Sequence, residues 1–112
     1  MNENIAPFKY MLYSNDEKAS LLLTNFDEKG FIFDERRSEG WEGGGYDWAS
    51  LAKVILEEQA PNLVEEIGFD PEADMFTAYG DKDSVWEFAQ ILKKAYDNDE
   101  VLRDALSRAE LD

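Results

Sequence analysis

Residues 75–96 read MFTAYGDKDSVWEFAQILKKAY, and this stretch decides the fold class. In Met75–Tyr79 both faces of an alternating run carry apolar groups, which predicts a strand in the interior of a sheet. After Gly80, Ser84 stands three residues before Glu87, the spacing of a capping box at the start of a helix. The apolar stripe of that helix is Val85, Phe88, Ala89, Leu92 and Tyr96. A central strand followed by a helix that packs on the sheet predicts an α+β domain.

The remaining strand patterns lie on both sides of a long glycine-rich segment. Two bulky runs separated by Asn15, Asp16, Glu17 and Lys18 predict a hairpin, and a turn at Asp27–Gly30 leads to the third strand of a meander. A later hairpin turns at Asp70–Ala73. The predicted strands are Phe8–Tyr13, Leu21–Leu23, Phe31–Phe33, Ile67–Phe69 and Met75–Tyr79. Together they predict an antiparallel sheet of about five strands.

Three to four helices are predicted to pack on this sheet. Asp47 is predicted to be the N-cap of the first helix, whose stripe begins at Trp48 and which runs to about Gln59. Pro61 suits the first turn of a short helix over 62–66 because its missing N–H costs nothing there. A break at Asp97 and Asn98 precedes a final helix reaching Leu111. No linker or internal repeat divides the chain, so residues 1–112 are predicted to form one domain.

The composition limits the chemistry that is available. The 112 residues include no cysteine and no histidine, which excludes disulfides, thiol nucleophiles, Cys or His metal ligands and the commonest general base. We therefore predict that the protein is not an enzyme and uses no cofactor or metal. The first residues show no basic and apolar leader, and no apolar run is long enough to span a membrane, so we expect a cytoplasmic protein.

The charge balance is strongly acidic along the whole chain. Asp and Glu number 26 against 11 Lys and Arg, which gives a net charge of −15. Such a surface repels nucleic acid and anionic membranes, and it attracts basic proteins over long distances. The alternative is that the acidity serves solubility alone. Either way, nucleic acid and membranes are not expected as partners.

The segment EGWEGGGYDW, residues 39–48, combines four glycines with aromatic and acidic side chains. It lacks the Lys and Ser/Thr of a phosphate-binding loop, and its acids oppose phosphate. We predict structural roles for Asp47 and Trp48, the second as a core anchor of the helix. For the partner-binding surface we predict Glu39, Trp41, Glu42 and Tyr46, assisted by Asp70, Glu72 and Asp74 from the most acidic part of the chain. Trp41 is predicted to lie outside the core as the main anchor.

Two motifs carry a resemblance to a known family. The string GYDW of Gly45–Trp48, running into Ser50, Leu51 and Ala52, and the string FDPEADMF of Phe69–Phe76 resemble the Immunity protein 51 family. The similarity extends over roughly residues 10–106, and the uninterrupted run of three glycines before Tyr46 departs from the pattern. Members neutralise toxins of bacterial polymorphic toxin systems. The resemblance implies a cognate toxin as partner, and the acidity suggests that this toxin is basic.

Two other functions remain open from the sequence. A small hydrolase could use acidic side chains with a divalent cation. A regulatory domain could self-associate through the final helix over 98–111, whose narrow stripe allows a monomer or a weak homodimer.

Overall fold

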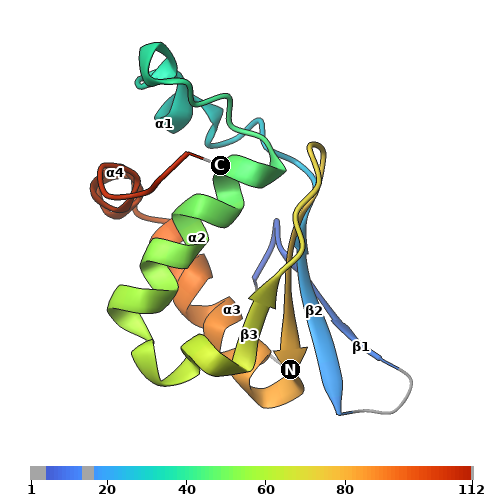
Figure 1. Ribbon diagram of the computed structural model, residues 1–112. Coiled ribbons are helices and arrows are strands. Elements are labelled where there is room, and N and C mark those ends of the chain that lie inside the picture. Colours follow the sequence, from blue (N-terminus) through green and yellow to red (C-terminus); the bar gives the residue numbers. More distant parts are fainter. Residues whose placement is uncertain (1–4, 14–16, 112) are drawn as a thin grey trace.

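The computed structural model describes residues 5–13 and 17–111, and its strands and helices form separate layers (Figure 1). The helices lie on one side of the sheet, where α2 and α3 cover it and α4 packs on those two helices. In chain order the elements, with η denoting 3₁₀ helices, are β1 (Lys9–Leu12), β2 (Lys18–Leu23), α1 (Gly30–Asp34), η1 (Arg37–Glu39), α2 (Gly45–Gln59), η2 (Pro61–Glu66), β3 (Ile67–Phe69), β4 (Phe76–Asp81), α3 (Lys82–Tyr96) and α4 (Asp99–Leu106). None of the described helices is long and apolar enough to cross a membrane.

The sheet is antiparallel, with the strand order β1-β2-β4-β3. The predicted central strand is confirmed, because β4 lies between β2 and β3. Leu21 pairs with Ala78, and both side chains are fully buried beneath the helices. Ser20 pairs with Tyr79 on the opposite face, where the Tyr79 side chain is 44% exposed. Alternation along the strands therefore gives the sheet one buried face and one face that no described helix covers.

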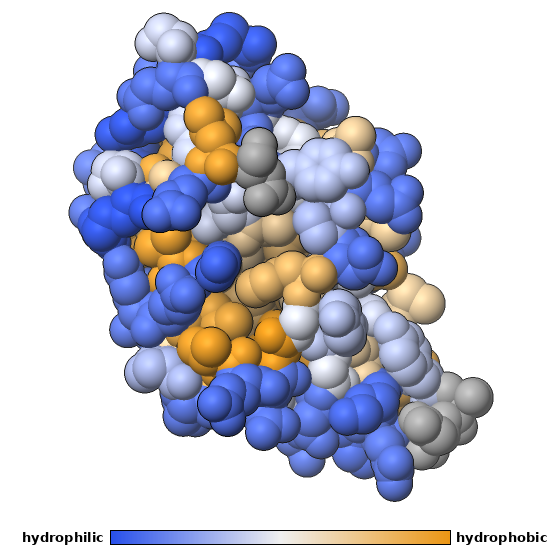
Figure 2. Space-filling model, viewed as in Figure 1, coloured by the Kyte–Doolittle hydropathy of each residue, from blue (hydrophilic) through white to orange (hydrophobic). Residues whose placement is uncertain are grey.

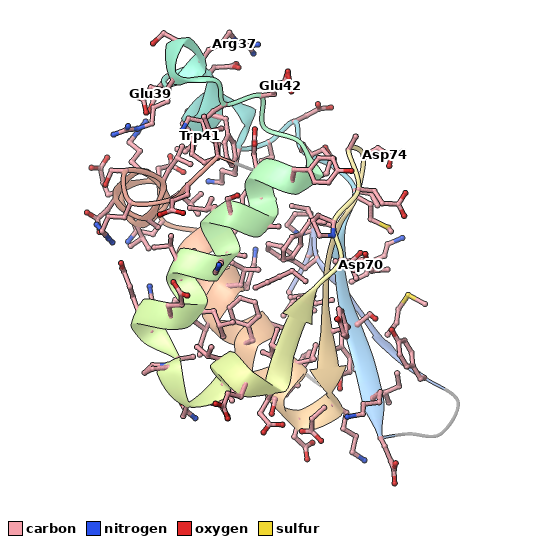
Figure 3. All side chains as sticks on the ribbon, in the orientation of Figure 1. Arg37, Glu39, Trp41, Glu42, Asp70 and Asp74 are labelled. Atoms are coloured by element: carbon pink, nitrogen blue, oxygen red, sulfur yellow. The ribbon has the colours of Figure 1, made fainter. Side chains whose placement is uncertain are left out.

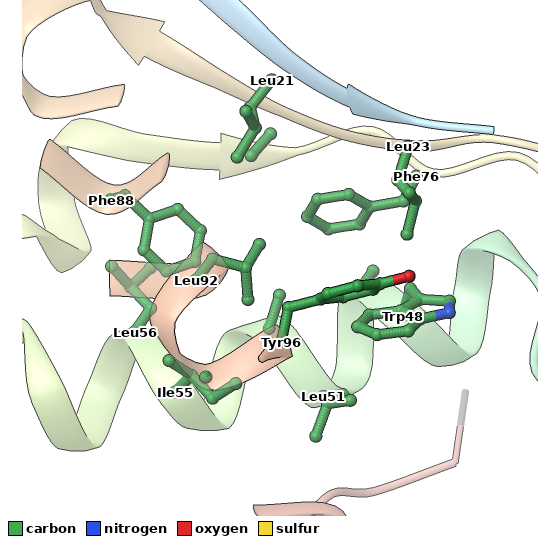
Figure 4. Close-up of a cluster of buried hydrophobic side chains, with 14 of the residues drawn as sticks. Leu21, Leu23, Trp48, Leu51, Ile55, Leu56, Phe76, Phe88, Leu92 and Tyr96 are labelled. Atoms are coloured by element: carbon green, nitrogen blue, oxygen red, sulfur yellow. The ribbon is translucent and has the colours of Figure 1, made fainter. Parts of the chain in front are cut away.

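The core fills the space between the sheet and the two long helices (Figure 4). Trp48 is fully buried at its centre, as predicted, and its ring stacks on that of Tyr96 with 5.7 Å between the centroids. Phe8 and Phe33 meet the same indole edge-on at 6.4 and 5.4 Å. Aromatic pairs in these geometries add to the free energy of burial. Trp48 thus joins α2 to α3, to α1 and to the segment just before β1.

One predicted strand is wrong, and the described residues form four strands where about five were expected. Phe31–Phe33 belongs to the helix α1, which follows the turn at Asp27–Gly30. Within this helix the adjacent residues Ile32 and Phe33 are both buried, while Phe31 is 41% exposed. Two adjacent buried side chains fit one face of a helix, whereas a strand would place them on opposite faces. The first predicted turn falls partly on Asn15 and Asp16, which lie outside the described residues.

Two of the predicted helix caps are wrong, and the other predicted helix boundaries agree with the structure in part. The capping box at Ser84 is wrong, because α3 begins two residues earlier and the Asp81 carboxylate accepts from the Ser84 N–H at 3.1 Å. The helix α2 starts after Gly44, so Asp47 is not its N-cap. The predicted end of α2 at Gln59, the short helix after Pro61 and the break at Asn98 are confirmed. The final helix ends at Leu106, short of the predicted Leu111.

Candidate functional site

The glycine run packs directly against the β3–β4 hairpin, so the two motifs that stand out in the sequence form one structural unit. The Gly45 N–H donates to the Ala73 carbonyl at 3.1 Å. A Cβ atom on Gly45 would lie 1.8 Å from the Glu72 oxygen, and one on Gly44 would lie 2.7 Å from the Ala73 oxygen. Only glycine allows the two backbones this approach. The start of α2 is thereby fixed against the hairpin tip.

The hairpin that receives this loop is itself closed by backbone hydrogen bonds. The Glu72 N–H donates to the Met75 carbonyl at 2.7 Å, and the Met75 N–H donates to the Glu72 carbonyl at 3.1 Å. Below them the Asp70 N–H donates to the Thr77 carbonyl at 3.0 Å. The side chains of the tip therefore project from a fixed backbone, which reduces the entropy lost when a partner binds them.

Asp47 holds the loop in place from inside. It lies in the first turn of α2 with 9% of its surface exposed, and its Oδ2 atom accepts from the N–H groups of Glu42 and Gly43 at 2.6 and 2.7 Å. Gly43 adopts the left-handed backbone conformation, with φ of +88°, that this arrangement needs. Hydrogen bonds to a carboxylate are stronger than hydrogen bonds between neutral groups. Asp47 therefore stabilises the loop before α2, which is a structural role different from the predicted helix cap.

Glu42 and Asp74 lie toward one end of the molecule, and Asp70 lies below Asp74 where β3 ends (Figure 3). Glu42 lies on the loop that leads into α2, Tyr46 lies in the first turn of α2 and is 47% exposed, and the remaining three acids lie on the hairpin. All four carboxylates are exposed, and none forms an ion pair within the described part of the chain. We call this surface the acidic end: Glu42, Tyr46, Asp70, Glu72 and Asp74.

Two predicted binding residues do not belong to this surface. The expectation that Trp41 lies outside the core is wrong, because its side chain is only 2% exposed and packs on Phe33 with 6.1 Å between ring centroids. Glu39 lies farther along on η1, and both of its carboxylate oxygens accept from the Arg36 guanidinium at 2.9 Å. Its charge is therefore partly balanced, and Trp41 serves the core.

A shallow hollow of about 500 Å³ beside the acidic end contains residues that sequence reasoning missed. It is lined by Phe26, Asp27, Gly30, Phe31, Asp34, Glu42, Gly43 and Gly44. Phe31 was assigned to a strand, which concealed the spacing of Asp27, Phe31 and Asp34 at four and three residues. Phe31 and Asp34 lie three residues apart in α1, a spacing that places side chains on one face of a helix, while Asp27 lies in the turn before it. The hollow adds an exposed ring and two carboxylates next to Glu42.

Ion pairs balance many acids outside the acidic end, including Asp34 of the hollow, which accepts from the Arg37 guanidinium. Arg103 holds Glu35 through two hydrogen bonds of 2.9 Å, and Arg108 holds Glu58 through two of 2.6 Å. Hydrogen bonds from these guanidinium groups lower the pKa of both glutamates. In the surface view of Figure 2, hydrophilic side chains dominate and hydrophobic ones emerge only in patches. The acidic end thus combines unbalanced carboxylates with an exposed tyrosine, a composition suited to binding lysine and arginine side chains.

Within residues 5–13 and 17–111, no group of three or more acidic side chains is arranged so that it could hold a metal ion. A model of the Immunity protein 51 family matches residues 10–111, which is nearly the whole chain. Neither the curated proteins nor the solved structures contain a match.

Proposed function

The chain belongs to the Immunity protein 51 family, and on this premise we propose that it neutralises a cognate bacterial toxin in the cytoplasm by direct contact through the acidic end. The observation that carries the proposal is the packing of Gly45 against Glu72 and Ala73. This contact brings the two distinctive motifs of the sequence together and presents their side chains on a fixed backbone. A binding surface built from both motifs explains why the sequence contains the two of them.

Electrostatics supports a basic partner. The chain carries a net charge of −15, and no lysine or arginine stands between Lys53 and Lys82. Long-range attraction between opposite charges speeds the encounter of two proteins and leaves dissociation mainly to short-range contacts. A toxin that acts on nucleic acid needs a basic surface of its own. We propose that this surface faces the acidic end.

Tyr46 replaces Trp41 as the proposed anchor. Tyrosine is enriched among the residues that dominate binding energy, and Tyr46 is half-exposed between Glu42 and the hairpin acids. Its ring offers a face to a cationic side chain, while the carboxylates accept hydrogen bonds from guanidinium or ammonium groups. Phe31 in the adjoining hollow is also exposed, and the chain's own Arg103 lies 5.7 Å from its ring centroid.

The test measures binding to the toxin encoded by the neighbouring reading frame. Tyr46→Ala should weaken binding by about 2 kcal/mol, roughly thirtyfold in Kd. Tyr79→Ala is the matched control, since Tyr79 is 44% exposed on the uncovered face of the sheet. It should bind like the unmodified protein. Equal affinities of the two variants would show that the acidic end is not the binding surface.

A second measurement examines the role of charge. Raising the salt concentration from low to physiological values should slow association with the toxin severalfold and leave dissociation nearly unchanged, because salt screens long-range attraction. An association rate that does not change with salt would remove the electrostatic argument.

A further inference from the structure

The hollow beside the acidic end is lined by a glycine that the backbone does not require. Gly30 begins α1 without a positive φ, and a Cβ atom placed on it would meet no other atom within 4 Å. At every other described glycine, a Cβ would lie 3.4 Å or less from a neighbouring atom. Because Gly30 lines the hollow, its missing side chain keeps part of that space open.

The hollow carries negative charge that the described residues balance only in part. Its lining includes three acids and no lysine or arginine. Asp34 is paired with Arg37, whereas Asp27 and Glu42 form no ion pair within the described part of the chain. These two carboxylates come from different segments, the turn before α1 and the loop before α2. An apolar occupant would remove them from water without a partner, and an anion would be repelled, so the hollow favours a cation.

The aromatic lining favours a guanidinium over an ammonium group. Phe26 and Phe31 both line the hollow, and the Phe31 side chain is 41% exposed. A guanidinium is planar and weakly hydrated, and it can stack on a ring while it donates hydrogen bonds to carboxylates in several directions. The chain contains this combination beside the hollow: the Arg103 guanidinium lies 5.7 Å from the Phe31 centroid and donates two hydrogen bonds of 2.9 Å to Glu35. Arg103 does not line the hollow itself, so it leaves that space open.

We propose that this hollow receives one arginine side chain of the partner, which packs against the open part of the Phe31 ring and donates hydrogen bonds to Asp27 and Glu42. This inference rests on the proposed function, since the partner is the basic toxin that binds the acidic end. Glu42 belongs to both surfaces, so the bound arginine lies next to the toxin residues that contact Tyr46.

The first experiment needs no toxin. In a titration of the full chain with Nα-acetyl-arginine amide at low salt, the backbone amide NMR signals of Gly30, Gly43 and Gly44 should shift and saturate, with a Kd of about 10 mM. The signals of Gly68 and Gly80, which do not line the hollow, are the control. Nα-acetyl-lysine amide should bind about threefold more weakly. Equal shifts of all five glycines, or equal affinities for the two amides, would overturn the arginine site.

Filling the hollow provides the second measurement. Gly30→Leu places a side chain in the open space, and Gly30→Ala is the matched control because it alters the same backbone position and adds little volume. Both variants should unfold at similar temperatures. Gly30→Leu should lose the shifts of Gly43 and Gly44 and bind the toxin about tenfold more weakly than Gly30→Ala. Equal toxin affinities of the two variants would refute the proposal even where Tyr46→Ala loses affinity, which concerns the acidic end alone.

Asp27→Asn tests the same site without added volume, so its result does not depend on how α1 accommodates the Gly30→Leu side chain. The matched control is Glu87→Gln, because Glu87 is an exposed acid on α3 that forms no ion pair among the described residues. Each variant removes one negative charge, so both should slow toxin association to a similar extent. Asp27→Asn should in addition speed dissociation about fivefold, because it weakens a short-range contact. Equal dissociation rates of the two variants would contradict the proposed contact.

Discussion

Replacing Gly45 by alanine should loosen the contact between the α2 loop and the hairpin. The new Cβ would lie 1.8 Å from the Glu72 oxygen and 2.5 Å from the Met75 oxygen, whereas real Cβ atoms stay beyond 3.0 Å. The two backbones must therefore separate by at least 3.0 − 1.8 = 1.2 Å. Overpacking of this kind costs about 1–3 kcal/mol, and loss of the bond to Ala73 adds about 1 kcal/mol. We expect a total near 3 kcal/mol, which corresponds to a fall in Tm of roughly 12 °C.

The matched control is Gly30→Ala. Gly30 also begins a helix, neither glycine has a positive φ, and a Cβ on Gly30 would meet no atom within 4 Å. Alanine there should change stability by no more than about 1 kcal/mol, in the stabilising direction. Thermal and urea unfolding followed by circular dichroism measure both variants. If Gly45→Ala melts at the same temperature as Gly30→Ala, the contact does not hold the two motifs together.

Three further predictions concern buried groups. Trp41→Ala and Trp48→Ala should each destabilise the fold by about 3–5 kcal/mol in urea titrations, since both side chains are buried; a stable Trp41→Ala variant would contradict its place in the core. Asp47→Asn should cost about 1–3 kcal/mol, because a neutral oxygen accepts the two loop N–H groups less strongly, and an unchanged unfolding midpoint would argue against this role. Burial and the hydrogen bond to Glu28 raise the pKa of Tyr96 far above its ordinary value of about 10. The stability that the neutral Tyr96 side chain contributes is therefore fully present below about pH 10, and it is lost as the pH rises above that value. Tyr96→Phe should therefore lose less stability than the unmodified protein as the pH rises from about 10 to 12, and identical pH profiles would contradict this account.

Long periodic patterns were the parts of the fold that the sequence could predict. The helix from Trp48 to Gln59 and the strand around Phe76 carry apolar spacing over many residues, and both are confirmed. The run Phe31–Phe33 is too short to show a period, and three apolar residues in sequence fit a strand and one helical turn equally well. Its helical state follows from the packing of Phe33 on Trp41 and Trp48, which come later in the chain.

The candidate site was predicted in composition but not in arrangement. Exposed acids and Tyr46 were identified from residue type and loop context. The inward turn of Trp41 was not, because a glycine-rich loop gives no periodicity from which to predict burial. The left-handed Gly40 and Gly43 on either side of Trp41 direct the chain there, and Asp47 fixes the result by hydrogen bonds to Glu42 and Gly43. Such contacts depend on the tertiary structure and leave no local pattern.

The uneven distribution of ion pairs has a consequence for how this molecule behaves before contact. Arg103 in α4 and Arg108 just after it balance Glu35 at the end of α1 and Glu58 in α2. The hairpin between β3 and β4, in contrast, has no lysine or arginine near it in sequence, because none stands between Lys53 and Lys82. The negative charge is therefore off-centre, and the protein has a permanent dipole moment. The field of a basic protein exerts a torque on this dipole, which turns the hairpin toward that protein while the two are still diffusing. A larger fraction of the collisions then brings the hairpin into contact with that protein.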